Sequence, residues 1–308
     1  MGKAYVNQHI VPRRYLDRFA TISNGNSIIG TRLSTQDGAK LFRKATSDVG
    51  YIRNIYDVTD KDDPKNWEHF FANEIDTLCG SEMGNIIAAA TLSQNKGGVL
   101  DKHGKEVLSK IIVAQIMRVP SSIEHIRRIY PETENEIKER ILSTLPKDLK
   151  KKYEQKVRDF KLDEQSQKEI YLNYTFAPEN FDRYCSYLQD QIWILYVNTE
   201  RRTMPFVTSD NPVLVEGIGN PEVGLFQNGL ANPTTCIFYP LSPSIAVAIY
   251  SKHGLLKAIQ ELGNSKVLLD EMDFIIGQNI KIIEQAHNHS FIPQPLFEEI
   301  DKALNNGE

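Results

Sequence analysis

The sequence predicts an α+β protein with a small N-terminal β element, a helical middle, and a β-rich C-terminal third closed by a helix. Short apolar runs flank turn-forming residues before residue 60, and apolar residues recur at helical spacing from residue 67 to residue 189. From residue 191 onward, short runs rich in β-branched and aromatic residues predominate. Strand-like and helix-like runs do not alternate regularly, which argues against a doubly wound sheet and an α/β barrel.

The first element is a short helix predicted at Pro12–Ala20, because proline suits the first helical turn and apolar residues follow at helical spacing. Residues 27–33 and 39–46 are predicted to form a hairpin around the turn at residues 35–38. Residues 50–56 are expected to continue as an extended segment. These short strands form the predicted N-terminal β element.

The middle of the chain is predicted to be helical after an acidic, proline-containing loop at residues 59–65. Asn66 or Asp63 could cap the first long helix, and Pro120 ends the second. The expected helical segments are 67–92, 104–119, 121–128, 131–172 and 181–189. The charged residues at 147–156 could form a phosphate-binding ridge, although mixed-sign charge on a long helix is more often a solvated face.

The C-terminal third is predicted to hold most of the strands. The expected strands are 191–197, 204–208, 235–239, 245–250 and 290–292, and the expected helix is 266–285. The prolines Pro240 and Pro243 are most simply edge or bulge devices. We expect residues 1–300 to form a single domain and residues 301–308 to be a polar, frayed tail.

Composition narrows the class of protein but does not fix its activity. The chain has 308 residues, 41% hydrophobic residues and a formal net charge of −4, as expected of a globular protein without a surface devoted wholly to nucleic acid. No apolar run reaches the roughly 20 residues that a membrane span needs. The start of the sequence lacks an apolar signal-peptide core, so we expect a cytoplasmic protein without a membrane partner. The three cysteines show no paired metal-ligand spacing.

Polar residues occupy positions on helix faces where the spacing demands apolar ones. Glu74 falls four residues after Phe70 in an apolar stripe, and Gln115 and Arg118 continue the buried face that contains Ile111. A buried charge needs a partner, so Arg118 is interpreted either as the structural mate of Glu74 or as a clamp for a substrate carboxylate or phosphate. Asn279 is a weaker third case.

Two further residues complete the candidate site. His9 lies just ahead of the first predicted helix, and its imidazole titrates near neutral pH. Asp210 leaves the end of a predicted strand, where scaffolds often display catalytic groups. It could equally be an Asx-turn residue before Pro212.

Three segments together resemble the domain-of-unknown-function 4238 family. They are His9-Ile-Val-Pro-x-x-Tyr-Leu-x-x-Phe19, Gln115-x-x-Arg-x-Pro120, and Phe206-x-Thr-Ser-Asp-x-Pro212 followed by Pro240-Leu-Ser-Pro243. The resemblance spans nearly the whole chain and therefore implies one domain. The family has no assigned function. Its occurrence in prokaryotic mobile and antiphage defence settings implies a nuclease-like or toxin-like role.

The first functional hypothesis is a hydrolase, most concretely a metal-assisted phosphodiesterase or nuclease. Glu74 and Asp210 would hold Mg²⁺ or Mn²⁺, and His9 would act as general acid or base. Arg118 would stabilise phosphate charge and Gln115 would orient water or the substrate, which would be a nucleic acid or nucleotide.

Two other functions remain open at this stage. The same residues could form a structural network in a non-enzymatic binding or regulatory module. A glycohydrolase or transferase acting on a nucleotide such as NAD ranks below both, because no glycine-rich phosphate loop is present.

Overall fold

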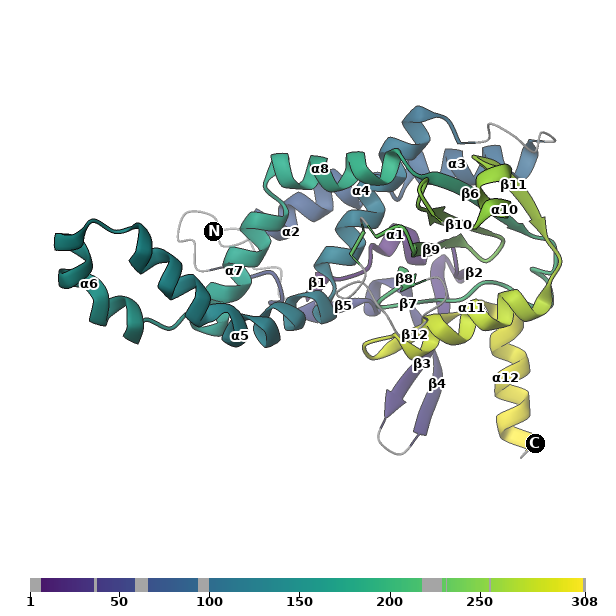
Figure 1. Cartoon of the computed structure of the whole chain (residues 1–308). Helices are drawn as coiled ribbons and strands as arrows, with labels where there is room; N and C mark the ends of the chain where they lie inside the picture. Colours follow the sequence, from purple (N-terminus) through teal and green to yellow (C-terminus); the bar gives the residue numbers. More distant parts are fainter. Residues whose placement is uncertain are drawn as a thin grey trace.

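The computed structural model describes residues 7–35, 38–58, 66–93, 100–217, 229–230, 232–254 and 256–306. Along the chain, a small N-terminal β element is followed by a helical middle and a β-rich C-terminal third, and the last element is a helix, so the predicted α+β class is confirmed (Figure 1). The predicted loop at residues 59–65, including Asp63, lies outside the described residues.

The N-terminal part contains short strands and one short helix. These elements are β1 (Asn7–His9), α1 (Arg13–Leu16), β2 (Thr21–Ser23), β3 (Asn26–Thr35), a 3₁₀ turn (Thr46–Asp48), β4 (Gly38–Ala45) and β5 (Tyr51–Arg53). The hairpin of β3 and β4 is confirmed, although residues 36 and 37 of its turn are not described. Both α1 and β5 are shorter than predicted. The backbone of Asn54 has a positive φ of 55°, which ends β5.

The first long helix predicted at residues 67–92 is instead three pieces. They are α2 (Asn66–Phe70), a π-helical turn (Phe71–Ile75) and α3 (Ser81–Leu92). The N–H of Asp76 bonds to the carbonyl of Phe71, five residues back, with an N···O distance of 2.8 Å. The guanidinium of Arg18 donates to the carbonyls of Cys79 and Gly80, which stabilises the break before α3.

The helical middle is confirmed, and it comprises α4 (Lys102–Arg118), α5 (Pro120–Thr144), α6 (Lys147–Asp159), α7 (Glu164–Thr175) and α8 (Pro178–Gln189). The segments predicted at 121–128 and 131–172, however, are divided differently into α5, α6 and α7. The carboxylate of Asp101 caps α4, and Pro120 occupies the first turn of α5. Figure 1 shows α5 and α6 extending away from the sheets. Among the described residues, no helix is both long and apolar enough to cross a membrane.

The C-terminal third holds the larger sheet. Its elements are β6 (Ile192–Asn198), β7 (Thr208–Ser209), β8 (Leu214–Gly217), β9 (Thr235–Ser242), β10 (Ile245–Tyr250), α10 (Lys257–Leu262), β11 (Ser265–Leu269), α11 (Met272–Glu284), β12 (His289–Ile292) and α12 (Gln294–Asn306). Five strands pair in the order β11-β6-β10-β9-β8, with β11 parallel to β6 and the other pairs antiparallel.

Several C-terminal predictions need correction. The segment predicted as the start of a helix at residue 266 is β11, whose backbone pairs in parallel with β6 at the edge of the sheet. The polar tail predicted from residue 301 continues helix α12 to Asn306. The register between β9 and β10 shifts next to Pro240, in agreement with the predicted bulge.

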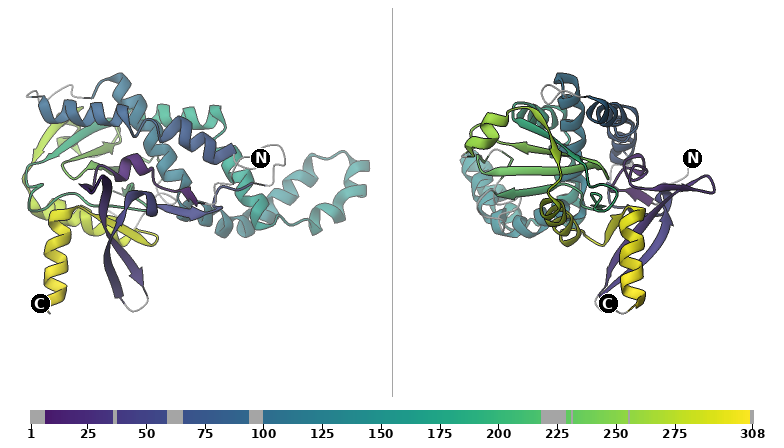
Figure 2. Two further views of the ribbon diagram at one scale, coloured as in Figure 1. Left: turned by 180° about the vertical axis from the view of Figure 1, so that it is seen from behind. Right: turned by 90° about the vertical axis from the view of Figure 1, so that its right-hand side faces the viewer.

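Both faces of the five-stranded sheet are covered. Trp193 and Leu195 of β6 face the core shared with α4 and α8, whereas Ile194 and Tyr196 face the core shared with α11. A second sheet orders β2-β3-β12-β7, with β4 also paired to β3. Figure 2 shows α12 beside the hairpin of β3 and β4. Alternate side chains of β6 therefore pack against helices on opposite faces of the five-stranded sheet.

Gly30 tests the packing of α12 against the second sheet. A Cβ atom at Gly30 would overlap the ring of Phe297 and lie 2.7 Å from the carbonyl oxygen of Ile292. We expect Gly30→Ala to lower the free energy of unfolding by about 1–3 kcal/mol in urea titrations, because neighbouring backbone cannot give way.

Gly277, inside α11, is the matched control for this prediction. A Cβ atom there would meet nothing within 4 Å, so Gly277→Ala should leave stability unchanged or raise it by about 0.5–1 kcal/mol. Equal effects of the two substitutions would contradict the packing described.

Candidate functional site

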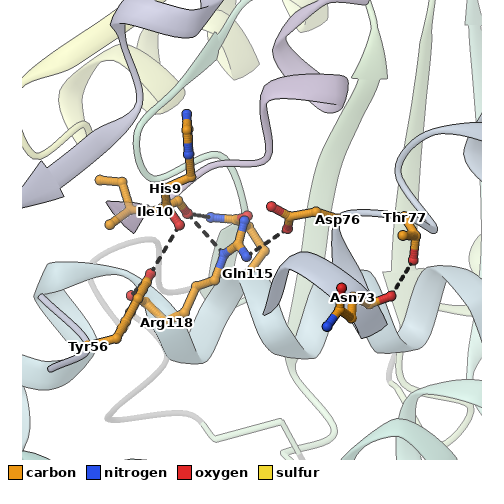
Figure 3. Close-up of polar contacts among 8 residues, drawn as sticks. All are labelled: His9, Ile10, Tyr56, Asn73, Asp76, Thr77, Gln115 and Arg118. Atoms are coloured by element: carbon orange, nitrogen blue, oxygen red, sulfur yellow. Dashed lines mark hydrogen bonds and ion pairs between the residues drawn. The ribbon is translucent and has the colours of Figure 1, made fainter. Parts of the chain in front are cut away.

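Two polar residues of α4, Gln115 and Arg118, form hydrogen bonds with the N-terminal segment of the chain. Gln115 and Arg118 are 1% and 0% exposed, which confirms that the buried face of this helix ends in polar groups. The Gln115 amide donates to the carbonyl oxygen of Ile10 at 2.8 Å, and Arg118 Nε donates to the same oxygen at 3.1 Å (Figure 3). These two side chains therefore fix the segment that follows β1.

Asp76, rather than Glu74, is the carboxylate that pairs with Arg118. The Arg118 Nη1 to Asp76 Oδ1 distance is 3.0 Å, and the Asp76 side chain is 23% exposed. Glu74 is exposed, so the prediction that it points into the core is wrong. The cause is the π-helical turn, whose extra residue moves Asp76 toward Phe71 and moves Glu74 outward.

The surroundings of Arg118 keep it charged although it is fully buried. Burial is the largest influence and disfavours the charge, but Asp76, Tyr56 and Cys79 outweigh it and raise the pKa of Arg118. The guanidinium also lies over the ring of Phe71, with Cζ 5.2 Å from the centroid. Its Nη2 atom has no hydrogen-bond partner among the described residues.

Glu68 of α2 is a site residue that the sequence analysis missed. Burial and then Asp76 raise the pKa of its carboxyl to about 7, while Arg118 and the backbone N–H of His9 act in the opposite direction. Its Oε2 atom is buried and has no partner within the described part of the chain. Glu68 lies three residues before Phe71 and seven before Ile75, so helical spacing could have marked it as facing inward.

His9 reaches the same cluster mainly through its backbone. It ends β1, opposite Tyr51 of β5, and its imidazole points away from the guanidinium of Arg118 (Figure 3). Burial, then Arg118 and Arg13, lower the pKa of His9, and Asp76 opposes them. The imidazole is therefore neutral at neutral pH, and its buried Nε2 lacks a partner among the described residues.

Asp210 lies at another position in the fold and binds backbone. Its carboxylate, 2% exposed, accepts hydrogen bonds from the N–H groups of His287, Asn288 and His289 at 2.7–2.8 Å. The backbone N–H of Asp210 donates to the carbonyl of His289. Asp210 thus ties the end of β7 to the loop before β12, and its partners are distant in sequence rather than those of an Asx turn.

The expected Mg²⁺ or Mn²⁺ site at Glu74 and Asp210 does not fit these surroundings. Glu74 is exposed on the π-helical turn, and the Asp210 carboxylate is directed at three backbone N–H groups. Among the described residues, no three His, Cys, Asp or Glu side chains form a group that could hold a metal ion.

The motif segments meet physically around the first motif. The Tyr15 hydroxyl donates to the carbonyl of Pro240 at 2.7 Å and lies 2.7 Å from the Thr208 hydroxyl. Asn279 is also structural, since its amide bonds to the backbone of Val207 and Pro205. The segment from His9 to Phe19 is therefore held by the other motifs through Ile10 and Tyr15.

Replacing Asp210 tests its structural assignment. Asp210→Ala removes the buried acceptor of three backbone N–H groups, so we expect a loss of about 2–4 kcal/mol in the free energy of unfolding. Urea denaturation followed by circular dichroism measures this loss. A variant as stable as the wild type would show that the carboxylate does not hold the loop before β12.

The pKa of Glu68 predicts a pH-dependent stability. The folded-state pKa of about 7 lies above the ordinary value of 4.5, so the folded protein retains a proton that the unfolded chain releases. This stabilisation is complete below pH 4.5 and is lost as the pH rises through about 7.

Glu68→Gln should abolish that loss, which we expect to be about 1–2 kcal/mol after allowance for partial exposure. Thermal unfolding of both proteins between pH 4.5 and 8 measures the difference. Glu74→Gln, on the exposed side of the π-helical turn, is the control and should follow the wild type. Parallel curves for wild type and Glu68→Gln would contradict the raised pKa.

Comparison with known protein families gives a match over most of the chain. A family model described as "Protein of unknown function (DUF4238)" matches residues 7–288. No curated protein and no solved structure matches the chain. The matched region contains all of the motif segments, from His9 to Pro243, together with Glu68 and Asp76. The chain therefore belongs to the DUF4238 family.

Proposed function

We propose that the protein is a hydrolase that cleaves a phosphodiester bond by general acid–base catalysis at the cluster of Glu68, Asp76 and Arg118. One observation carries the proposal. The buried atoms Glu68 Oε2 and Arg118 Nη2 have no hydrogen-bond partner among the described residues, and the nearby Asp76 side chain is still 23% exposed. A carboxyl group with a raised pKa, such as that of Glu68, is typical of acid–base sites.

Each side chain has a distinct role in the proposed reaction. The Asp76 carboxylate accepts a proton from the water molecule that attacks phosphorus, and protonated Glu68 donates a proton to the leaving alkoxide oxygen. One P–O bond forms as the other breaks, which yields a phosphate monoester and an alcohol. The free N–H of Arg118 bonds to a phosphoryl oxygen.

The substrate proposed is a nucleic acid or nucleotide, and a cytoplasmic role in antiphage defence is part of the same proposal. No step requires a cation at Glu74 and Asp210. Gln115 supports the site by holding Ile10. The imidazole of His9 points away from Arg118, so its catalytic role stays a prediction.

A second candidate is a non-enzymatic binding module with a structural polar network. Arg118 and Gln115 both bond to the carbonyl of Ile10, and the Asp210 carboxylate accepts hydrogen bonds from three backbone N–H groups, which favours structural roles for these three residues. Under this function, Glu68 would only fill its place in the core.

Hydrolysis of a chromogenic phosphodiester and of RNA and DNA oligonucleotides, with EDTA present, tests the two candidates. We expect cleavage by the wild type, a decline as the pH rises through about 7 when Glu68 loses its proton, and a loss of at least about 100-fold in Glu68→Gln. Activity that requires added Mg²⁺ or Mn²⁺ would contradict the proposed mechanism.

Matched variants separate catalysis from folding. Glu74→Gln should retain activity, whereas the metal-site prediction requires its loss. His9→Gln shows whether the imidazole contributes. Full activity in Glu68→Gln, or no cleavage of any phosphodiester by the folded wild type, would overturn the acid–base proposal and favour the binding module.

A further inference from the structure

A cavity separate from the cluster of Glu68, Asp76 and Arg118 opens where helices α5 and α7 meet the β-strand part of the fold. Its volume is about 550 Å³. It lies between the end of β5, the first turn of α5, helix α7 and the loop before β12, and α5 and α7 lie side by side there (Figure 1). Its polar lining includes Arg53, Asn54, Ser121, Glu124, Arg127 and Lys168. The volume falls in the range of small-molecule sites.

Lys168 of α7 is the most informative residue of this cavity. It is only 7% exposed, and its ammonium forms no hydrogen bond or ion pair with any residue that the structure describes. Burial, then Arg127, disfavour its charge, whereas Asp57 and Glu169 favour it, and the net effect lowers the pKa of Lys168. The side chain is largely buried and lines the cavity, so an anion bound there would supply the ammonium with a partner.

Other cationic groups surround the same space. Arg53 is exposed at the end of β5, and Arg127 lies on α5 with its side chain 34% exposed. Glu124 and Glu164 contact Arg127 at 3.3 and 3.6 Å and offset part of its charge. Lys168 and Arg53 form no ion pair with a carboxylate among the described residues. The three cationic side chains of the lining therefore outnumber its carboxylate, Glu124.

The first turn of α5 adds further affinity for an anion. Pro120 and Ser121 line the cavity at the start of this 25-residue helix, where the helix dipole favours negative charge. Asn54 faces the helix start from the left-handed turn after β5.

The remaining lining is apolar and is suited to the body of a ligand rather than to a bare ion. Ile52, Ile55 and Ile123 contribute aliphatic surface next to the cationic groups. A ligand that carries a phosphate group on a flat or apolar body would fill both parts of the cavity.

We propose that this cavity binds a phosphate monoester of nucleotide size, with the phosphate between Lys168, Arg53 and the start of α5. The site shares no side chain with the Glu68, Asp76 and Arg118 cluster, so it is independent of the proposed hydrolase activity. The shared chemistry is the phosphate group, which a mononucleotide or free phosphate could provide.

Isothermal titration calorimetry of the full chain with AMP, inorganic phosphate and adenosine tests the proposal. We expect AMP to bind and adenosine to bind at least about tenfold more weakly, because adenosine lacks the charge that Lys168 requires. Phosphate binding as tight as that of AMP would identify free phosphate as the source. Adenosine binding as tight as AMP binding, or no binding of AMP and phosphate, would overturn the proposal.

Three variants assign the binding to this cavity. Lys168→Met keeps the aliphatic stem and should weaken AMP binding at least about tenfold. Arg53→Gln changes an exposed side chain and should also weaken binding, without a risk to folding. Lys161→Met, on the exposed segment before α7, is the matched control and should bind AMP as the wild type does. Equal affinity in Lys168→Met, Arg53→Gln and Lys161→Met would show that AMP binds elsewhere.

Discussion

A guanidinium with no exposure to water is the constraint on which the rest of this structure depends. Arg118 must form its ion pair and hydrogen bonds with protein atoms, because an unpaired charge in the interior costs several kcal/mol. Asp76 neutralises the charge, and the carbonyl of Ile10 accepts from Nε. The carbonyl of Arg118 itself accepts from the Tyr56 hydroxyl. One side chain thereby joins the N-terminal segment, the π-helical turn and the end of α4.

The same constraint leaves two polar atoms of the site without a hydrogen-bond partner among the described residues. The partners of Arg118 use its Nε and Nη1 atoms, while Nη2 and the Oε2 atom of Glu68 stay unanswered within the described chain. The π-helical turn brings Asp76 to the guanidinium and leaves it partly exposed. A purely structural ion pair needs neither feature. Arg118 and Asp76 therefore belong both to the structural network and to the proposed acid–base site. Glu68 is the residue that the proposed reaction needs and the structural network does not.

The sequence was informative where helices are regular. The spacing in α4 marked Gln115 and Arg118 as buried, because an α-helix begun at the Asp101 cap keeps its period to the last turn. The prediction failed at Glu74 because the spacing of apolar residues does not reveal a π-helical turn. At that turn Asp76, instead of Glu74, faces the buried arginine. Asp210 was recognised as special, but its partners at residues 287–289 follow from strand pairing that the local sequence does not encode.

A double-mutant cycle on Arg118 and Asp76 tests the central claim most directly. The free energy of unfolding in urea would be measured for the wild type, Arg118→Met, Asp76→Asn and the double variant. If the pair holds the three segments together, each single variant strands a charge or a donor, and the double variant loses less than their sum by about 2 kcal/mol or more. Losses that add within about 0.5 kcal/mol would mean that the two groups act independently, and would contradict the account.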